Sequence, residues 1–168
     1  MKAVYTGTFD PITNGHLDII ERASHMFDEV TVLIMSNPAK HCLFTMEERR
    51  EMIEKSLASL PDVNNVSVLV GEGLTVEMAR KLGAVAIVRG IRAVSDYEYE
   101  LKQATANMKL NGNIETMLMI ARPEYSFLSS SVVKEIAVYG GDIEGMVPDA
   151  IIDEVRKKFD GMKREAVN

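Results

Sequence analysis

Two side chains that can bond a phosphate, Thr8 and His16, flank a turn rich in Gly and Pro within the segment YTGTFDPITNGH, residues 5–16. Strand-like apolar residues precede the turn and an amphipathic helix follows it. His16 therefore falls in the first turn of that helix, where unpaired N–H groups and the positive end of the dipole favour an anion. The same location lowers an imidazole pKa, which predicts a neutral His16 that donates one N–H and stabilises charge without being a strong base.

A second group of cations lies in the segment RGIR, residues 89–92, where two arginines flank a glycine after an apolar run. An arginine at the buried end of a strand is costly unless it is paired or holds an anion, which favours a functional role. Glu100 follows on the next helix, and it could hold a ribose, hold an arginine, or be solvated. Lys40 follows another apolar run; it could clamp a phosphate, although a loop lysine alone is more often solvated.

Three consecutive serines open a later helix in the segment YSFLSSS, residues 125–131. A single serine would be enough for an N-cap. Three hydroxyls together with unpaired helix N–H groups also suit the oxygens of a triphosphate. The three segments together indicate nucleotide chemistry.

Strand-like and helix-like segments alternate along the whole chain. The hydrophobic pattern predicts strands at 2–5, 30–35, 66–70, 84–88 and 115–121. It predicts helices at 14–27, 46–60, 75–82, 95–110, 130–139 and 149–159. Thr45 with Glu48, and Ser95 with Glu98, have the spacing of capping boxes. We expect one domain over residues 1–160, followed by a polar, frayed tail over 161–168.

Five strands separated by helices predict an α/β fold, a single doubly wound Rossmann-like domain with a parallel sheet. In the common strand order 3-2-1-4-5, ligands bind beyond the carboxyl ends of strands 1 and 4. The segments 6–10 and 89–92 directly follow those two strands. Residue chemistry and the assumed topology therefore select the same place.

Composition narrows the class of protein. The chain has 168 residues and a net charge of −6, which argues against bulk binding to nucleic acid or an acidic membrane. A single cysteine, Cys42, excludes an internal disulfide, and no apolar run suggests a membrane span or signal peptide, so we expect a cytoplasmic protein. The sequence contains no phosphate loop of the G-x-x-x-x-G-K-[ST] type, no G-x-G-x-x-G fingerprint and no zinc-ligand spacing.

Four segments, taken together, carry a resemblance to a known family: YTGTFDPITNGH, NPAK, RGIRAVSDYEYE and YSFLSSS. In this order and spacing they resemble the bacterial phosphopantetheine adenylyltransferases, members of the nucleotidyltransferase superfamily that carries a T/H-x-G-H motif, here Thr13-Asn14-Gly15-His16. The resemblance covers residues 2–160. It implies transfer of the adenylyl group of ATP to 4′-phosphopantetheine, which gives dephospho-coenzyme A and pyrophosphate. It also implies Mg²⁺ that arrives with ATP, a hexamer, and coenzyme A as a feedback ligand.

The resemblance also implies a role for individual residues, with no metal ligand among them. Catalysis would fall to Thr8, His16, Lys40 and Arg92. The acceptor would be bound by Thr8, Lys40, Leu74, Thr75 and Arg89. ATP would be bound by Thr8, Phe9, His16, Gly90, Ile91, Arg92, Glu100, Tyr125, Ser126, Phe127, Leu128, Ser129, Ser130 and Ser131. Two departures from the family pattern, Thr6 in place of Pro and His41-Cys42 in place of Lys-Pro, change none of these residues.

The reaction chemistry predicts direct in-line transfer. The attacking phosphate has a second pKa of about 6, so at pH 7 it is already largely a dianion and needs no general base. Without an activated nucleophile in the sequence, catalysis would be positioning plus stabilisation of charge. Other readings of the residues remain open: another adenylyl- or cytidylyltransferase of the superfamily, a non-catalytic nucleotide or coenzyme A sensor, and a flavodoxin-like binding protein.

Overall fold

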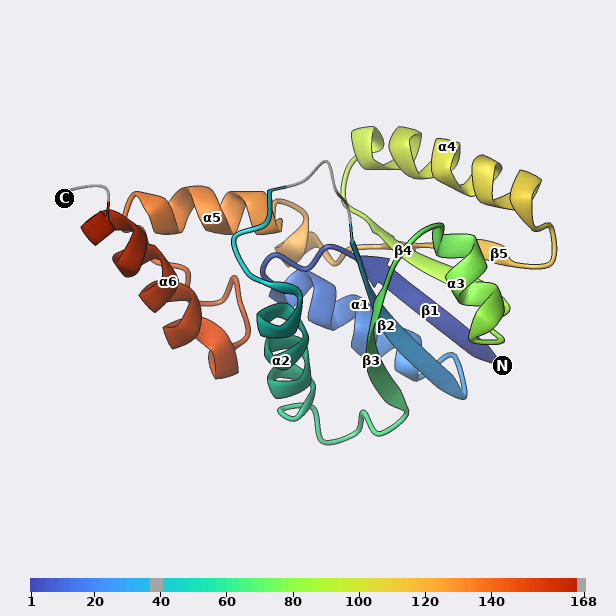
Figure 1. Ribbon diagram of the computed structural model, residues 1–168, viewed down its shortest axis with the longest axis horizontal. Coiled ribbons are helices and arrows are strands. Elements are labelled where there is room, and N and C mark those ends of the chain that lie inside the picture. The colour runs from blue at the N-terminus through green and yellow to red at the C-terminus, as the bar shows by residue number, and fades with distance from the viewer. Residues whose placement is uncertain (37–40, 166–168) are drawn as a thin grey trace.

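The computed structural model describes residues 1–36 and 41–165, with the backbone alone for 162–165. Its centre is a five-stranded sheet in the order β3-β2-β1-β4-β5 in which every neighbouring pair is parallel (Figure 1). The strands are β1 (Lys2–Gly7), β2 (Glu29–Met35), β3 (Val66–Gly71), β4 (Ala86–Ile91) and β5 (Glu115–Ile120). The predicted fold class and strand order are confirmed.

Helices cover both faces of this sheet. They are α1 (Asn14–Ser24), α2 (Met46–Leu57), α3 (Thr75–Lys81), α4 (Val94–Leu110), α5 (Ser130–Val138) and α6 (Ile152–Glu165). Helices α1 and α2 pack on one face, and α3 and α4 pack on the other. Helices α5 and α6 lie together at the end of the sheet opposite the N-terminus (Figure 1). None of the helices in the described ranges is long and apolar enough to cross a membrane.

The central strands bury both of their faces, because their side chains alternate between two apolar clusters. Val4 of β1 and Ile87 of β4 belong to the cluster beneath α3. Tyr5 and Val88, the next residues along these strands, belong to the larger cluster on the opposite face. Continuous apolar runs in the sequence thus reflect burial on both sides.

Strand β4 is displaced along the chain from its predicted position. It begins at Ala86 and continues to Ile91, so that Arg89 and Gly90 pair with Leu118 and Met119 of β5. Residues 89–91 are therefore the last residues of the strand. We had expected them to follow it. Strand β1 likewise extends to Gly7. Both changes leave the polar residues at the carboxyl edge of the sheet.

The capping predictions had mixed outcomes. Thr45 and Glu48 form the expected capping box at the start of α2. The box predicted at Ser95 is wrong: α4 begins at Val94, and its N-cap receives no side-chain hydrogen bond. The carboxylate of Asp96 instead accepts a hydrogen bond from the backbone N–H of Arg92.

Helix α6 also differs from its predicted bounds. A turn of 3₁₀ helix, Asp149–Ile151, precedes it, and α6 continues beyond Phe159 to Glu165. The first part of the predicted tail is therefore helical. A single glycine such as Gly161 costs a helix only about 1 kcal/mol, which is too little to end it.

Candidate active site

A cavity of about 770 Å³ opens at the carboxyl ends of β1 and β4. Its walls come from β1 and the turn after it, the end of β4, the first turns of α4 and the start of α5. This is the place that the assumed strand order predicted. The predicted site residues that line it are Thr8, Phe9, His16, Thr75, Arg89, Gly90, Arg92, Glu100, Tyr125, Leu128, Ser129, Ser130 and Ser131.

Four predicted site residues do not line this cavity. Leu74 and Phe127 are more than half exposed, and Leu74 is the N-cap residue of α3. The Ser126 hydroxyl donates to the carbonyl of Pro123 at 2.8 Å, and Ile91 ends β4. Lys40 lies outside the described residues. The segment 125–131 thus contributes to the cavity through only some of its side chains.

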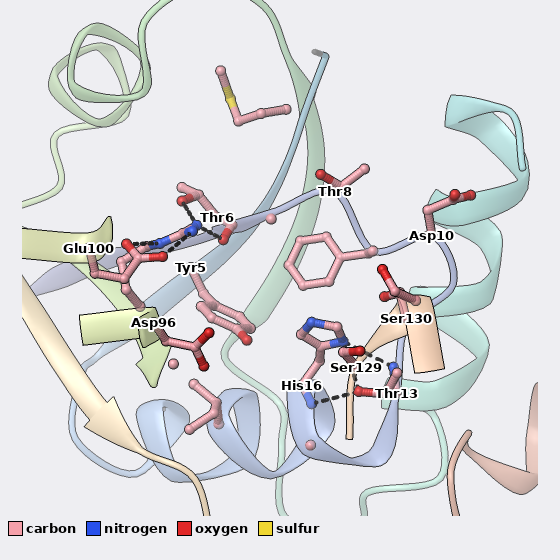
Figure 2. A pocket seen from close by; sticks show the side chains of 18 of the residues that line it. Tyr5, Thr6, Thr8, Asp10, Thr13, His16, Asp96, Glu100, Ser129 and Ser130 are labelled. Carbon is pink, nitrogen blue, oxygen red and sulfur yellow. Dashed lines mark hydrogen bonds and ion pairs between the residues drawn. The ribbon is translucent and has the colours of Figure 1, made fainter. Parts of the chain in front are cut away.

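His16 and Thr13 form a reciprocal cap at the start of α1. His16 Nδ1 lies 3.1 Å from the backbone nitrogen of Thr13 and 3.0 Å from Thr13 Oγ1, while the backbone N–H of His16 donates to Thr13 Oγ1 at 3.3 Å. An amide N–H can only donate, so Nδ1 is the acceptor and the neutral ring carries its proton on Nε2. The second ring nitrogen lies on the side of the ring that faces Thr8 (Figure 2).

The imidazole of His16 is neutral for reasons that differ in part from those expected. Burial, and to a smaller extent the positive charges of Arg92 and Arg89, together lower the pKa of His16 to about 4. The helix N-terminus was the reason we expected, whereas desolvation is the largest cause. His16 is therefore a neutral hydrogen-bond donor at neutral pH and only a weak base.

Phe9 supports the ring of His16 from a strained backbone position. Its φ of 49° lies in the left-handed region, which costs a non-glycine residue about 1–2 kcal/mol. The Phe9 ring meets the His16 ring edge to face with centroids 5.2 Å apart, and it meets the Tyr5 ring in the same manner at 5.5 Å. A side chain at Gly7 would come within 2.8 Å of the Phe9 ring, so the glycine makes room for it.

Arg89 is bound to a carboxylate within the cavity wall. Its Nε and Nη2 donate to the two oxygens of Glu100 at 2.8 and 2.7 Å, and its Nη1 donates to the carbonyl and hydroxyl oxygens of Thr6. Glu100 and Thr6 lie near each other in this wall (Figure 2). Of the three readings of Glu100, the structure confirms the one that pairs it with an arginine. Burial alone would lower the pKa of Arg89, but the hydrogen bonds and charge of Glu100 outweigh it and raise that pKa.

Arg92 is oriented in a similar way. Its Nε and Nη2 donate to the carboxylate of Asp96 at 2.9 and 3.1 Å, and its Nη1 donates to the carbonyl of Leu128 at 2.9 Å. Burial would raise the pKa of Asp96, but the hydrogen bonds and charge of Arg92 hold it below its ordinary value. The pair joins the start of α4 to the loop before α5 and holds a cation at the cavity.

Two of the three serines at the start of α5 have structural partners. Ser129 is the N-cap, and its Oγ accepts from the backbone N–H of Val132 at 3.1 Å. The Ser130 hydroxyl donates to the carbonyl of Pro11 at 2.7 Å. This second bond ties α5 to the turn before α1, which places the N-terminus of α5 at the cavity.

Sequence reasoning missed several residues of this wall. Asp10, Thr13, Asp96 and Lys134 all line the cavity. Lys134 follows Ser130 by four residues and shares its face of α5, a helical spacing that could have identified it. Asp10 gave no such signal, because its hydrogen-bond partners lie more than 30 residues away in the chain.

Carboxylates in the cavity do not form a metal centre. In the described ranges, no group of three or more His, Cys, Asp and Glu residues is placed to hold a metal ion. The carboxylates of Asp96 and Glu100 are bound to arginines. Arginines and N–H donors therefore dominate the chemistry of the site, which suits a polyanionic ligand.

Comparisons with known proteins identify the family of the chain. Residues 4–136 match the model of the cytidylyltransferase-like family. The chain is 49% identical to the phosphopantetheine adenylyltransferase of Finegoldia magna over 158 residues, 94% of this chain and 96% of that protein. It is 51% identical to the enzyme of that name from Clostridium kluyveri over 159 residues, 95% of each chain.

A solved structure supports the fold. The nicotinic acid mononucleotide adenylyltransferase of Plasmodium falciparum, complexed with NaAD, superposes with a TM-score of 0.71 over 93% of this chain and 94% of that chain. Because the two sequences are only 16% identical, this similarity concerns the fold alone. Since the curated relatives share about half of their residues with this chain over nearly its whole length, the chain belongs to the phosphopantetheine adenylyltransferases within the cytidylyltransferase-like family.

Proposed function

We propose that this protein transfers the adenylyl group of ATP to 4′-phosphopantetheine, giving dephospho-coenzyme A and pyrophosphate in coenzyme A biosynthesis. The observation that carries the proposal is the family membership, at 48–51% identity over nearly the full chain. The cavity supports it, because a neutral histidine donor and two arginines meet at the switch point of a doubly wound sheet.

In the proposed reaction the acceptor phosphate attacks the α-phosphate in line, without a covalent enzyme intermediate. Nε2–H of His16 and the side chain of Thr8 would bond the oxygens on which charge develops. Arg92 would bind the pyrophosphate leaving group, and Phe9, Gly90 and the segment 125–131 would surround the nucleotide. Catalysis then comes from placement and charge stabilisation, because the acceptor phosphate is already largely a dianion and His16, with a pKa of about 4, is a weak base.

By the resemblance, the acceptor would be bound by Arg89, Lys40 and Thr75. Arg89 has five N–H donors, and Glu100 and Thr6 engage four of them, which leaves one on Nη2 for a phosphate oxygen. We infer that Arg89 chiefly shapes the wall of the cavity. Lys40 would then supply most of the positive charge that binds the acceptor phosphate. Leu74 would border the pantetheine arm at the mouth of the cavity.

Mg²⁺ would arrive with ATP, bound by phosphate oxygens. Mg²⁺ keeps much of its water and favours substrate phosphates over all-protein cages, which fits the arginine-bound carboxylates of the site. Mg²⁺ would neutralise part of the negative charge of the phosphates.

We also infer that copies of the chain associate, through α4. This helix buries only Glu100, whereas Tyr99, Met108 and Leu110 are more than half exposed. Apolar surface of this extent commonly marks an interface. The hexamer, feedback by coenzyme A and a cytoplasmic location remain proposals from the resemblance; sedimentation of the wild type and of Met108→Glu tests the assembly.

The function is tested by pyrophosphate release from ATP and Mg²⁺, with and without 4′-phosphopantetheine, and with nicotinamide mononucleotide as a parallel acceptor. We expect release only with phosphopantetheine. Release only with the mononucleotide would move the protein to another activity of the superfamily. Binding of ATP or coenzyme A without release under any condition would favour a sensor.

A further inference from the structure

The turn from Thr8 to Asp10 brings Thr8, which is predicted to bind phosphate, to the cavity. The backbone of this turn has a conformation that the chain does not favour by itself. Phe9, in the middle of this turn, has a positive φ. A side-chain-bearing residue keeps such a conformation only where its surroundings hold it, and such residues gather at functional sites. The contacts that hold this turn are therefore of functional interest.

Asp10 provides one set of these contacts. Its Oδ1 accepts from the backbone N–H of Phe44 at 2.9 Å, and its Oδ2 accepts from the backbone N–H of Leu43 at 3.0 Å and from Lys134 Nζ at 2.7 Å. The residue is 3% exposed. The carboxylate points away from His16, toward α2 (Figure 2). Both oxygens are thus engaged by the protein and not directed at a reactant.

Arg49 provides the second set from the same direction. This residue of α2 is buried, and its Nη1 donates to the carbonyl of Thr8 at 2.8 Å while its Nε donates to the carbonyl of Thr45 at 3.3 Å. Arg49 of α2 therefore holds the turn by the backbone of Thr8, and the loop directly before α2 holds it by the side chain of Asp10.

We propose that Asp10 is a positioning residue for adenylyl transfer, which fixes the Thr8–Asp10 turn to the start of α2 and to α5 without touching the reactants. The proposal rests on the proposed function for the reaction it assists. A carboxylate in an anion-binding cavity is explained in this way, because its charge is matched by Lys134 and two backbone N–H groups. Burial would raise the pKa of Asp10, but these hydrogen bonds lower it overall, so the carboxylate stays ionised.

The test compares Asp10→Asn with Glu48→Gln. Glu48 is a matched control, because its carboxylate also accepts from a backbone N–H, that of Thr45 at 2.7 Å, and from a lysine, Lys158 at 2.9 Å, but it does not line the cavity. Both variants are assayed below their melting transitions. We expect kcat of Asp10→Asn to fall about ten- to a hundredfold, as for a slightly misplaced reacting geometry, and kcat of Glu48→Gln to stay within about twofold of wild type.

The affinity for ATP separates positioning from binding. Asp10→Asn leaves the Lys134 ammonium without its carboxylate, so ATP should bind as tightly as in the wild type or more tightly. A kcat within about twofold of wild type, an equal loss of kcat in Glu48→Gln, or a weakened affinity for ATP would each overturn the proposal. If Asp10→Asn does not fold, Arg49→Lys tests the same turn through Thr8: kcat should again fall about tenfold or more and the affinity for ATP should stay unchanged, because lysine lacks the fork that reaches both carbonyls.

Amide hydrogen exchange keeps the proposal testable apart from the proposed function. Asp10→Asn should speed exchange at Leu43 and Phe44, whose N–H groups donate to its carboxylate, and Glu48→Gln should leave both unchanged. If the wild type transfers no adenylyl group, the proposed function fails, and the positioning proposal is then decided here. Unchanged exchange at Leu43 and Phe44 in Asp10→Asn would refute it.

Discussion

The backbone N–H of Thr13 donates to Nδ1 of His16 across 3.1 Å, and this single contact fixes which nitrogen of the imidazole carries the proton. The same two residues form the N-cap of α1, where the His16 backbone N–H returns to Thr13 Oγ1. The residues that start the helix therefore also set the tautomer of the proposed catalytic donor. The helix cap and the proposed catalytic donor are therefore one structure.

The first prediction concerns the protonation of His16. Since burial lowers its pKa to about 4, we expect a neutral ring protonated on Nε2 from pH 7.5 down to about pH 5. Nitrogen NMR of the imidazoles reports this state, and the His16→Ala variant identifies the signals among the three histidines of the chain. A ring that takes up its proton near pH 6.5 would contradict the prediction.

The same shift has a consequence for stability with a definite sign. The unfolded chain binds this proton near the ordinary pKa of about 6.5, whereas the folded protein binds it only near 4. The contribution of His16 is therefore complete above pH 6.5 and is lost as the pH falls toward 4. Urea denaturation at pH 7 and pH 5 should show a larger loss of stability in the wild type than in His16→Ala.

The second prediction concerns the role of His16 in the reaction. A donor that acts on developing charge contributes to kcat more than to substrate affinity. We expect His16→Ala to lower kcat about a hundredfold or more while the affinity for ATP changes by no more than about threefold. His25→Ala is the control, because His25 lies exposed at the C-cap of the same helix. A His16→Ala protein that lost only affinity for ATP would exclude a role in the transition state.

The third prediction separates the two functions of Thr13. Thr13 and Thr45 both cap helices in reciprocal boxes, but only Thr13 contacts a residue of the cavity. Replacing either with Val should cost about 1 kcal/mol of stability through the lost cap. Only Thr13→Val should also lower kcat, by about tenfold, because His16 loses the hydroxyl beside Nδ1. Equal values of kcat in the two variants would show that the cap is structural alone.

Much of the fold could be predicted because its signals are local. Apolar runs mark the strands, and the carboxyl edge of the sheet follows from the order of parallel strands. The predicted end of β4 was wrong, because a charged Arg89 and a glycine at 90 are not typical of a buried strand. Arg89 is accommodated there by Glu100 of α4 and Thr6 of β1, partners that the periodicity of β4 does not reveal.

The site was predictable to the extent that its residues lie in short segments. Thr8, His16 and Arg92 were found by type and position. Asp10 was not found, because its proposed positioning role depends on hydrogen bonds from Lys134, which lies 124 residues away, and from N–H groups of a loop. Ser95 matched a capping pattern, but Asp96 and Arg92 form the local contact that the backbone adopts.

The last prediction concerns the ion pair between Arg89 and Glu100. The Glu100 side chain is 8% exposed and the Arg89 side chain 27%, so the pair is mostly removed from water. Arg89→Met leaves the buried Glu100 carboxylate without its cation, so we expect the free energy of unfolding to fall by about 3 kcal/mol.

The double variant Arg89→Met with Glu100→Gln should recover part of this loss, because no buried charge remains uncompensated. The exposed pair of Arg50 and Glu54 on α2 is the control, where Arg50→Met should cost no more than about 1 kcal/mol. Urea denaturation of the wild type and these three variants measures the loss in each case. A loss in Arg89→Met no larger than in Arg50→Met would mean that solvent screens the pair at the cavity, and Arg89 would then be free to leave Glu100 for a phosphate.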